Sequence, residues 1–476
     1  MKTKNVSSVE LTEECLKNAL RSKNNTYISL LNDSAVLRAK KADEEIHQNG
    51  TMTLLHGIPF SLKDLFITKG IRTTAGSKML FNYIPPYESF VAQSLLDAGG
   101  ILIGKTNLDE FGMGATNETS AFGPVLNPLD PKKSPGGSSG GSAVSIIEES
   151  SYFSMGTDTG GSIRLPANYC GLVGYRPSYG RVSRYGQIAF SSSLDQAAPI
   201  AQCVLDIACI MELISTKDRR DETNLELGKL DLVSNLLSLD LKYIQGKKIG
   251  LSEHLLDECE EDVKIEMLKA LAHFKKMGAE LVPISLPHLK ESLPAYYAIS
   301  SGEASSNLAR YTGSLFGLQK SNHELTSAHL KDHYFEQCKT NRTSGFGDEV
   351  KFRLLIGALS LLPEKGESLF KKASQVRRLV CQDFELAFSH CDFIFSPVSR
   401  TVASDLNSSI SFETDSKNDF YNVPASLAGL PALALPFGKG KNNLPTGFQL
   451  ISKALSDSEL LKIGHAFELS LGRDVV

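Results

Sequence analysis

Two glycine- and serine-rich turns dominate the sequence, Pro135-Gly-Gly-Ser-Ser-Gly-Gly-Ser142 and Gly156-Thr-Asp-Thr-Gly-Gly-Ser-Ile-Arg164. Glycine costs backbone entropy inside regular structure, so this density indicates positions that need unusual dihedral angles or close backbone approach. A flexible Gly/Ser linker is the simplest alternative. The apolar residues of segments 143–155 and 163–173 argue against a linker, because linkers seldom have core sequence on both sides. We therefore expect both turns to lie inside a packed domain.

The composition is that of a globular protein, with 476 residues, of which 41% are hydrophobic and 22% charged. The formal net charge of −4 gives no basic footprint for nucleic acid, so any RNA substrate should be gripped mainly by a partner. The eight cysteines form no C-x-x-C pair and no zinc-ligand spacing, which favours free thiols in a reducing cytoplasm. No secretory signal and no apolar run of membrane-spanning length is present, so we expect a cytoplasmic protein without a membrane span.

Helical and strand patterns alternate along the chain, which predicts an α/β fold. Residues 89–98 have a helical pattern that ends at a Gly-Gly pair, and residues 101–104 follow as an apolar strand. From Thr106 the chain is expected to open another helix, with Asp109 and Glu110 in its first turn. We expect residues 1–476 to form a single domain. Its parts would be N-terminal helices in residues 8–50, a core in residues 55–201 and a further α/β part in residues 240–476.

The first turn allows two familiar interpretations. A phosphate-binding loop is disfavoured, because residues 136–142 lack the Lys-Ser/Thr ending of a P-loop. Residues 136–140 match G-x-S-x-G, which would make Ser138 the nucleophile of a Ser-His pair. No histidine occurs between residues 57 and 253, and His254 lies in a charged stretch. A distant histidine remains an alternative, because catalytic triads assemble in space and not in sequence.

A serine nucleophile activated by lysine is the third interpretation. Lysine acts as a base near neutral pH only when burial or a neighbouring cation lowers its pKa. Lys63 and Lys105 each follow an apolar strand segment, residues 58–62 and 101–104, and this is where burial would act. The ordinary alternative for either residue is a lysine whose side chain extends from a strand end into solvent.

Ser162 is the sharper nucleophile candidate, because it closes Thr157-Asp-Thr-Gly-Gly-Ser162 where a helix could begin. There the backbone N–H groups could converge on an oxyanion, with donors from Thr159, Gly160, Gly161 and Ser162. The ordinary alternative is a structural turn with a serine N-cap.

Taken together, Lys63 and the two turns resemble the amidase signature family, and the resemblance is strongest over residues 55–201. It implies an α/β fold with a large mixed central β-sheet covered by α-helices on both faces. It also implies a Ser-Ser-Lys catalytic set. Ser162 would attack an amide carbonyl, and Ser138, joined to Gly137 by a cis peptide bond, would relay the proton toward neutral Lys63.

Within the family the chain most resembles the glutaminase subunits of tRNA-dependent amidotransferases. The segments that carry this resemblance are residues 69–74, 106–111, 120–124, 177–186 and 192–196. It implies hydrolysis of glutamine at Ser162. The ammonia would pass to a partner subunit that uses ATP and Mg²⁺ to convert Glu-tRNA(Gln) or Asp-tRNA(Asn) to the amide form. A small third subunit would complete a heterotrimer, and this chain itself would carry no cofactor or metal.

Glutamine recognition requires one group for its carboxylate and one for its ammonium. The resemblance places these roles on Arg353 and Asp419, with Tyr296 as a third pocket residue, and arginine can bind a carboxylate in bidentate fashion. The sequence departs from the family pattern at Phe352, which replaces a basic residue, and over residues 361–369, which lack a tyrosine-rich run.

Two other functions are compatible with the sequence. A stand-alone amidase would use the same Lys63, Ser138 and Ser162 on a different amide, and it would purify without partners. A non-catalytic assembly subunit would not need this intact set, which argues against that function.

Overall fold

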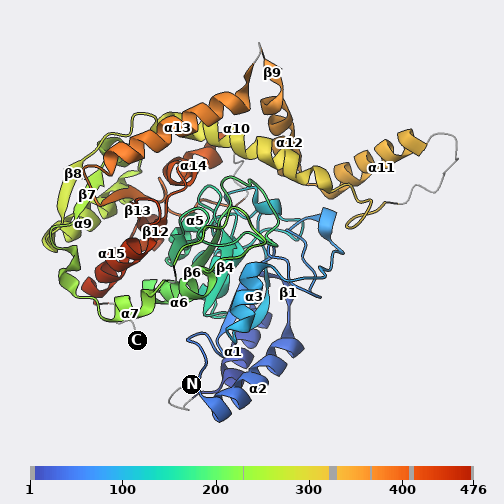
Figure 1. Ribbon diagram of the computed structural model, residues 1–476, viewed down its shortest axis with the longest axis horizontal. Coiled ribbons are helices and arrows are strands. Elements are labelled where there is room, and N and C mark those ends of the chain that lie inside the picture. The colour runs from blue at the N-terminus through green and yellow to red at the C-terminus, as the bar shows by residue number, and fades with distance from the viewer. Residues whose placement is uncertain (1–5, 229, 321–329, 365–366, 407–411, 473–476) are drawn as a thin grey trace.

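The computed structural model describes the chain except for residues 1–5, 229, 321–329, 365–366, 407–411 and 473–476 (Figure 1). In the described residues, eleven strands form one sheet in the order β1-β3-β2-β4-β6-β5-β12-β13-β11-β7-β8. These strands are β1 Tyr27–Leu30, β2 Pro59–Lys63, β3 Ile101–Thr106, β4 Phe153–Thr157, β5 Val173–Arg176, β6 Ala197–Ala201, β7 Lys248–Leu251, β8 Glu280–Pro283, β11 Phe393–Pro397, β12 Ala432–Lys439 and β13 Pro445–Ser452. A separate hairpin pairs β9 (Pro363–Glu364) with β10 (Glu367–Ser368).

The sheet is mixed, as the family resemblance implies. Strand β2 runs parallel to both β3 and β4, whereas β6 pairs with β4 and β5 in antiparallel fashion. The central strands β2, β4 and β6 are buried along their whole length, and the edge strands β1 and β8 are only partly covered. Continuous apolar strands, rather than alternating ones, are what a sheet covered on both faces requires.

Helices cover the two faces of the sheet (Figure 1). They are α1 Ser8–Arg21, α2 Asn32–Asn49, α3 Phe90–Asp97, α4 Gly140–Ile147, α5 Arg164–Cys170, α6 Val204–Ile214, α7 Leu232–Leu237, α8 Glu253–Asp257, α9 Glu261–Lys276, α10 Leu289–Asn307, α11 Leu330–Gly345, α12 Asp348–Leu361, α13 Leu369–Ala387, α14 Phe412–Leu427 and α15 Asp457–Ser470. Strand β6 shows how the faces are divided. Ala197 and Ala201 belong to the same buried cluster as residues of α3, α6, α9 and α15, whereas Ala198 and Ile200 belong to a cluster with residues of α4 and α5, since successive side chains of a strand point to opposite faces.

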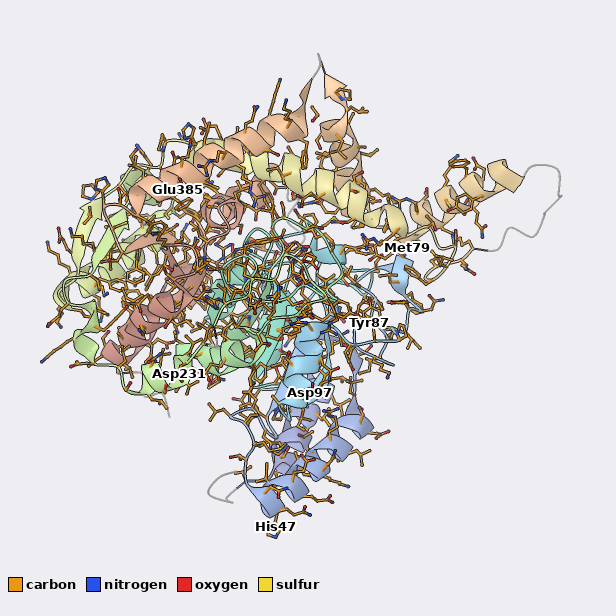
Figure 2. The ribbon with its side chains drawn as sticks, in the orientation of Figure 1. His47, Met79, Tyr87, Asp97, Asp231 and Glu385 are labelled. Carbon is orange, nitrogen blue, oxygen red and sulfur yellow. The ribbon has the colours of Figure 1, made fainter. Side chains whose placement is uncertain are left out.

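Helix α10 is the centre of a second layer of helices that includes α12, α13 and α14 (Figure 1). Helix α11 projects away from this layer, and its last residue, Gly345, lies beside Met79 near the base of the projection (Figure 2). Across the described part of the chain, no helix is both long and apolar enough to cross a membrane.

The helix predicted from Thr106 onward is wrong. Thr106 ends β3, and the chain continues as a loop with a single 3₁₀ turn, Glu110–Gly112. Phe111 has a φ of 52°, which a helix does not permit. The carboxylates of Asp109 and Glu110 bond to neighbouring segments and do not cap a helix.

Candidate active site

Lys63 occupies the carboxyl end of β2 and is fully buried. Its Nζ is hydrogen-bonded to three hydroxyl groups, Ser138 Oγ at 2.8 Å, Ser139 Oγ at 2.7 Å and Thr157 Oγ1 at 2.9 Å. The two serines belong to the turn before α4, and Thr157 ends the neighbouring strand β4. Within the described residues no carboxylate lies within ion-pair distance of Lys63, so its amine is surrounded by neutral oxygen atoms.

Burial lowers the pKa of Lys63 to about 7, against the opposing effect of Asp109, Asp158 and Asp195. A large fraction of the amine is therefore neutral at physiological pH, and a neutral amine has a lone pair that can accept a proton. Lys63 therefore has the lowered pKa that a lysine base needs near neutral pH, a property that the sequence alone could not establish.

Lys105, the other strand-end lysine, has a different environment. Its Nζ lies 3.0 Å from Asp64 Oδ1 and donates to Phe66 O at 2.7 Å and to Thr73 Oγ1 at 3.0 Å. Both partners of this ion pair are fully buried. Burial lowers the pKa of Lys105, but the adjacent Asp64 carboxylate opposes that shift and favours the ammonium as its counter-ion. Lys105 is thus a structural cation, and Lys63 is the candidate base.

Ser138 is held in the first turn by bonds to its backbone. The Gly137–Ser138 peptide bond is cis, as the resemblance implies. Gly137 N–H donates to Ala115 O at 2.7 Å, and Ser138 O accepts from Asp109 N–H at 3.2 Å. A Cβ at position 137 would lie 2.0 Å from Asp109 Oδ2, so only glycine fits there. Glycine at this position is needed for close approach, and the loop around it fixes where the Ser138 hydroxyl points.

The second turn folds around the carboxylate of Asp158, which is fully buried. Arg164 binds this carboxylate with two nitrogens, Nε to Oδ2 at 3.0 Å and Nη2 to Oδ1 at 2.9 Å. Although burial acts in the opposite direction, Arg164 and Arg176 hold the pKa of Asp158 well below its usual range. The ionised carboxylate accepts from Gly161 N–H at 3.0 Å, which shapes the loop that ends at Ser162.

The four predicted oxyanion donors differ in whether their N–H groups already have a partner. Gly161 N–H already donates to Asp158 Oδ1, so in this structure it is not free to donate to an oxyanion. The N–H groups of Thr159, Gly160 and Ser162 donate to none of the residues that the structure describes. Three of the four predicted donors therefore stay as candidates. No local pattern in the sequence indicated that an aspartate side chain would occupy the fourth.

Ser162 is partly exposed, two residues before α5 begins. The structure brings Ser138 and Lys63 together, but the Ser162 hydroxyl has no hydrogen bond to a described residue. The step from Ser162 to Ser138 stays a prediction, and catalytic hydrogen bonds often tighten only when substrate binds.

The three predicted pocket residues converge on Tyr297, which was not among the residues predicted from the sequence. Tyr297 donates to Asp419 Oδ2 at 2.7 Å, and Arg353 Cζ lies 5.1 Å from the centroid of its ring. Tyr296 packs its hydroxyl against Gly160, where an added Cβ would lie 2.5 Å from Tyr296 Oη. These residues come from α10, α12 and α14, and the contact between Tyr296 and Gly160 places this group beside the loop that ends at Ser162. The sequence feature that points to Tyr297 is its position directly after Tyr296, which was itself predicted.

The departures from the family pattern fall on exposed positions. Phe352 has 46% of its surface exposed, whereas Arg353, the next residue of α12, is buried. Leu361, Leu362 and Leu369 are also exposed, at the ends of the helices that flank the β9–β10 hairpin. Within the segment 361–369, residues 365–366 lie outside the described residues.

Comparison with known proteins agrees with this geometry. The family model described as Amidase matches residues 10–461. A glutamyl-tRNA(Gln) amidotransferase subunit of Prochlorococcus marinus is 43% identical over 473 residues, which cover 98% of this chain and 95% of that protein. The solved structure of the corresponding glutamyl-tRNA(Gln) amidotransferase subunit from Thermotoga maritima is 32% identical with a TM-score of 0.72, covering 98% of this chain and 95% of that one.

A peptide amidase from Stenotrophomonas maltophilia is 28% identical and superposes with a TM-score of 0.82, covering 98% of this chain and 94% of that one. The match to the family model spans nearly the whole chain, and the sheet, the Lys63–Ser138 contact and the Gly/Ser turns lie within it. The chain belongs to the amidase family.

Proposed function

We propose that this chain is the glutamine-hydrolysing subunit of a tRNA-dependent amidotransferase. The observation that carries the proposal is its identity of 41–43% over nearly its full length to proteins named as one and the same subunit of glutamyl-tRNA(Gln) amidotransferase. The charges of the predicted pocket residues support it, because Arg353 and Asp419 are a cation and an anion as the two charged groups of glutamine require. In this structure Arg353 pairs with Glu349 at 2.6 Å and Asp419 accepts from Tyr297 at 2.7 Å, so glutamine would share or replace these partners.

The reaction begins with neutral Lys63. It accepts a proton from Ser138 Oγ, to which it is hydrogen-bonded, while Ser138 takes the proton of Ser162. Ser162 Oγ attacks the side-chain carbonyl of glutamine, and the N–H groups of Thr159, Gly160 and Ser162 stabilise the oxyanion. Ser138 gives a proton to the leaving nitrogen, which departs as ammonia, and Lys63 returns its own proton to Ser138. Water then cleaves the glutamyl ester on Ser162 and releases glutamate.

Substrate orientation falls to the pocket on α10, α12 and α14. Arg353 binds the α-carboxylate and Asp419 the α-ammonium, with Tyr296 closing the side next to Gly160. Burial raises the pKa of Asp419 to about 6, against the effects of Tyr297 and Arg353. Asp419 is therefore mostly ionised at pH 7 and above, and glutamine binding weakens as pH falls through about 6.

The other half of the overall reaction belongs to partner subunits. A kinase and transamidase subunit binds ATP, Mg²⁺ and the misacylated tRNA, and a small subunit links it to this chain in a cytoplasmic heterotrimer. The net charge of −4 supports this division, since it offers tRNA no broad basic surface.

A stand-alone amidase is the second candidate, because the peptide amidase has the higher TM-score, 0.82 against 0.72. A TM-score compares backbones, whereas sequence identity also counts the side chains that recognise substrate. Identity favours the amidotransferase subunit, 32% against 28% among these two structures.

Co-purification from the native cells tests the proposed function. We expect the tagged chain to bring down two further subunits, and the complex to convert Glu-tRNA(Gln) to the amide form with glutamine as nitrogen donor. A chain that purifies alone and hydrolyses peptide or simple amides without tRNA would instead be a stand-alone amidase.

Arg353→Ala is expected to raise KM for glutamine by about tenfold to hundredfold, because a charge-assisted hydrogen bond contributes about 1.5–3 kcal/mol. The measurement is steady-state glutaminase kinetics of the complex. Lys351→Ala is the matched control, since Lys351 lies on the same helix and pairs with Asp348 at 3.2 Å near the surface. An unchanged KM in Arg353→Ala would remove Arg353 from the pocket.

A further inference from the structure

The loop that replaces the predicted helix after β3 forms a cradle for the first Gly/Ser turn. Asp109 N–H donates to Ser138 O at 3.2 Å, and Ala115 O accepts from Gly137 N–H at 2.7 Å. Asn117 Oδ1 accepts from the N–H of Gly140 at 2.8 Å. The loop therefore holds the turn before, at and after Ser138.

The carboxylate of Asp109 organises this cradle from inside. It is fully buried and accepts from Asn117 N–H at 2.9 Å, from Thr119 N–H at 3.2 Å and from Thr119 Oγ1 at 3.0 Å. Its Oδ2 occupies the space beside Gly137, because a Cβ there would lie 2.0 Å away. The carboxylate is thus packed directly against the peptide that carries Ser138.

Three carboxylates raise the pKa of Lys63, and only Asp158 among them is paired with cations in the described residues. Asp158 is bound by Arg164 and Arg176, and Asp195 accepts from Thr159 Oγ1 at 2.7 Å. Among the described residues, neither Asp109 nor Asp195 forms an ion pair with a cation, and Asp109 has the largest effect of the three in raising the pKa of Lys63. Burial raises the pKa of Asp109 itself to about 6.

We propose that Asp109 is a positioning residue for the reaction. It holds the Gly137–Ser138 turn against Lys63, and its negative charge stabilises the protonated form of that base. The proposal rests on the proposed function of Lys63 and Ser138. A base works best when its pKa lies near the working pH, since it must both take the proton and give it back. Burial alone would push the pKa of Lys63 lower, and the negative charge of Asp109 opposes that shift.

Asp109→Asn tests this inference, because it keeps the shape of the side chain and removes its charge. In the wild type, kcat/KM for glutamine should rise with pH through about 7 as Lys63 becomes neutral. Loss of the negative charge disfavours the ammonium form, so the acid limb in Asp109→Asn should move to lower pH by about one unit. The rate on the plateau should fall about tenfold or more, because the base is weaker and Ser138 is less firmly held.

Glu110→Gln is the matched control. Glu110 is the next residue, is also buried, and accepts from Ser77 Oγ and from Gly347 N–H, on the side of the loop that faces α12. Burial raises its pKa to about 7, but it is not among the groups that act on Lys63. The acid limb of Glu110→Gln should therefore stay at the wild-type pH.

The same pH series should be repeated with a fluorophosphonate, which reacts with an activated serine hydroxyl and needs no glutamine. An acid limb that does not move in Asp109→Asn, in either assay, would overturn the inference and leave Asp109 a purely structural residue. Absence of both labelling and glutamine hydrolysis in the wild-type complex would overturn the proposed function instead, and this inference with it. If Asp109→Asn does not fold, Thr119→Val removes a hydrogen bond that favours ionised Asp109. A smaller shift in the same direction is then expected, and no shift would contradict the inference.

Discussion

Ser162→Ala is expected to abolish glutamine-dependent amide formation while ammonia-dependent amide formation by the assembled enzyme survives. Only the first reaction needs a nucleophile on this chain, because free ammonia supplies directly what glutamine hydrolysis otherwise releases. Removal of a catalytic serine should lower glutaminase kcat by at least about 10⁴-fold. The measurement is conversion of Glu-tRNA(Gln) by the complex with glutamine or with ammonium chloride as nitrogen source.

The ammonia reaction serves as the control within this experiment. Its survival shows that the variant folds and still assembles with its partners. If glutamine-dependent activity also survives, the nucleophile lies elsewhere, and Ser138 with its G-x-S-x-G match becomes the first alternative.

Exchange of each buried lysine for methionine should separate catalysis from stability. Lys63→Met is expected to lower glutaminase kcat by about 10²–10⁴-fold, the usual contribution of a general base, with little change in the free energy of unfolding. Lys105→Met should do the reverse, because it leaves the Asp64 carboxylate buried without its counter-ion. Breaking a buried ion pair in this way costs about 3–5 kcal/mol.

Both variants are compared by glutaminase kinetics and by denaturant unfolding of the purified chain. Robust hydrolysis by Lys63→Met would revive a distant histidine as the base. An unchanged unfolding free energy in Lys105→Met would mean that Asp64 finds another partner or becomes protonated.

The sequence does not distinguish the roles of the two lysines. Both follow apolar strand segments, so burial could be predicted for each of them. What distinguishes them is their partners, hydroxyl groups around Lys63 and the Asp64 carboxylate beside Lys105. Thr157 lies 94 residues from Lys63 in the chain, and no local pattern reports that contact.

Asp109 was missed for a related reason. Asp and Glu after a strand are typical of a helix first turn, so the sequence predicts a helix start at this point. The tertiary contacts of the Asp109 carboxylate with Gly137, Asn117 and Thr119 override that local preference. The sheet order was equally inaccessible, because β12 pairs with β5 across more than half of the chain.

In the proposed function, the catalytic residues and the residues that recognise glutamine come from different stretches of this chain. Lys63, Ser138 and Ser162 precede α6, whereas Tyr296, Arg353 and Asp419 lie on helices of the second layer, after β8. If the proposed roles hold, mutations in the second layer are expected to change which amide is accepted without disturbing the groups that cleave it. With this arrangement, natural or engineered substitutions in the second-layer helices could alter substrate specificity while the catalytic residues stay unchanged.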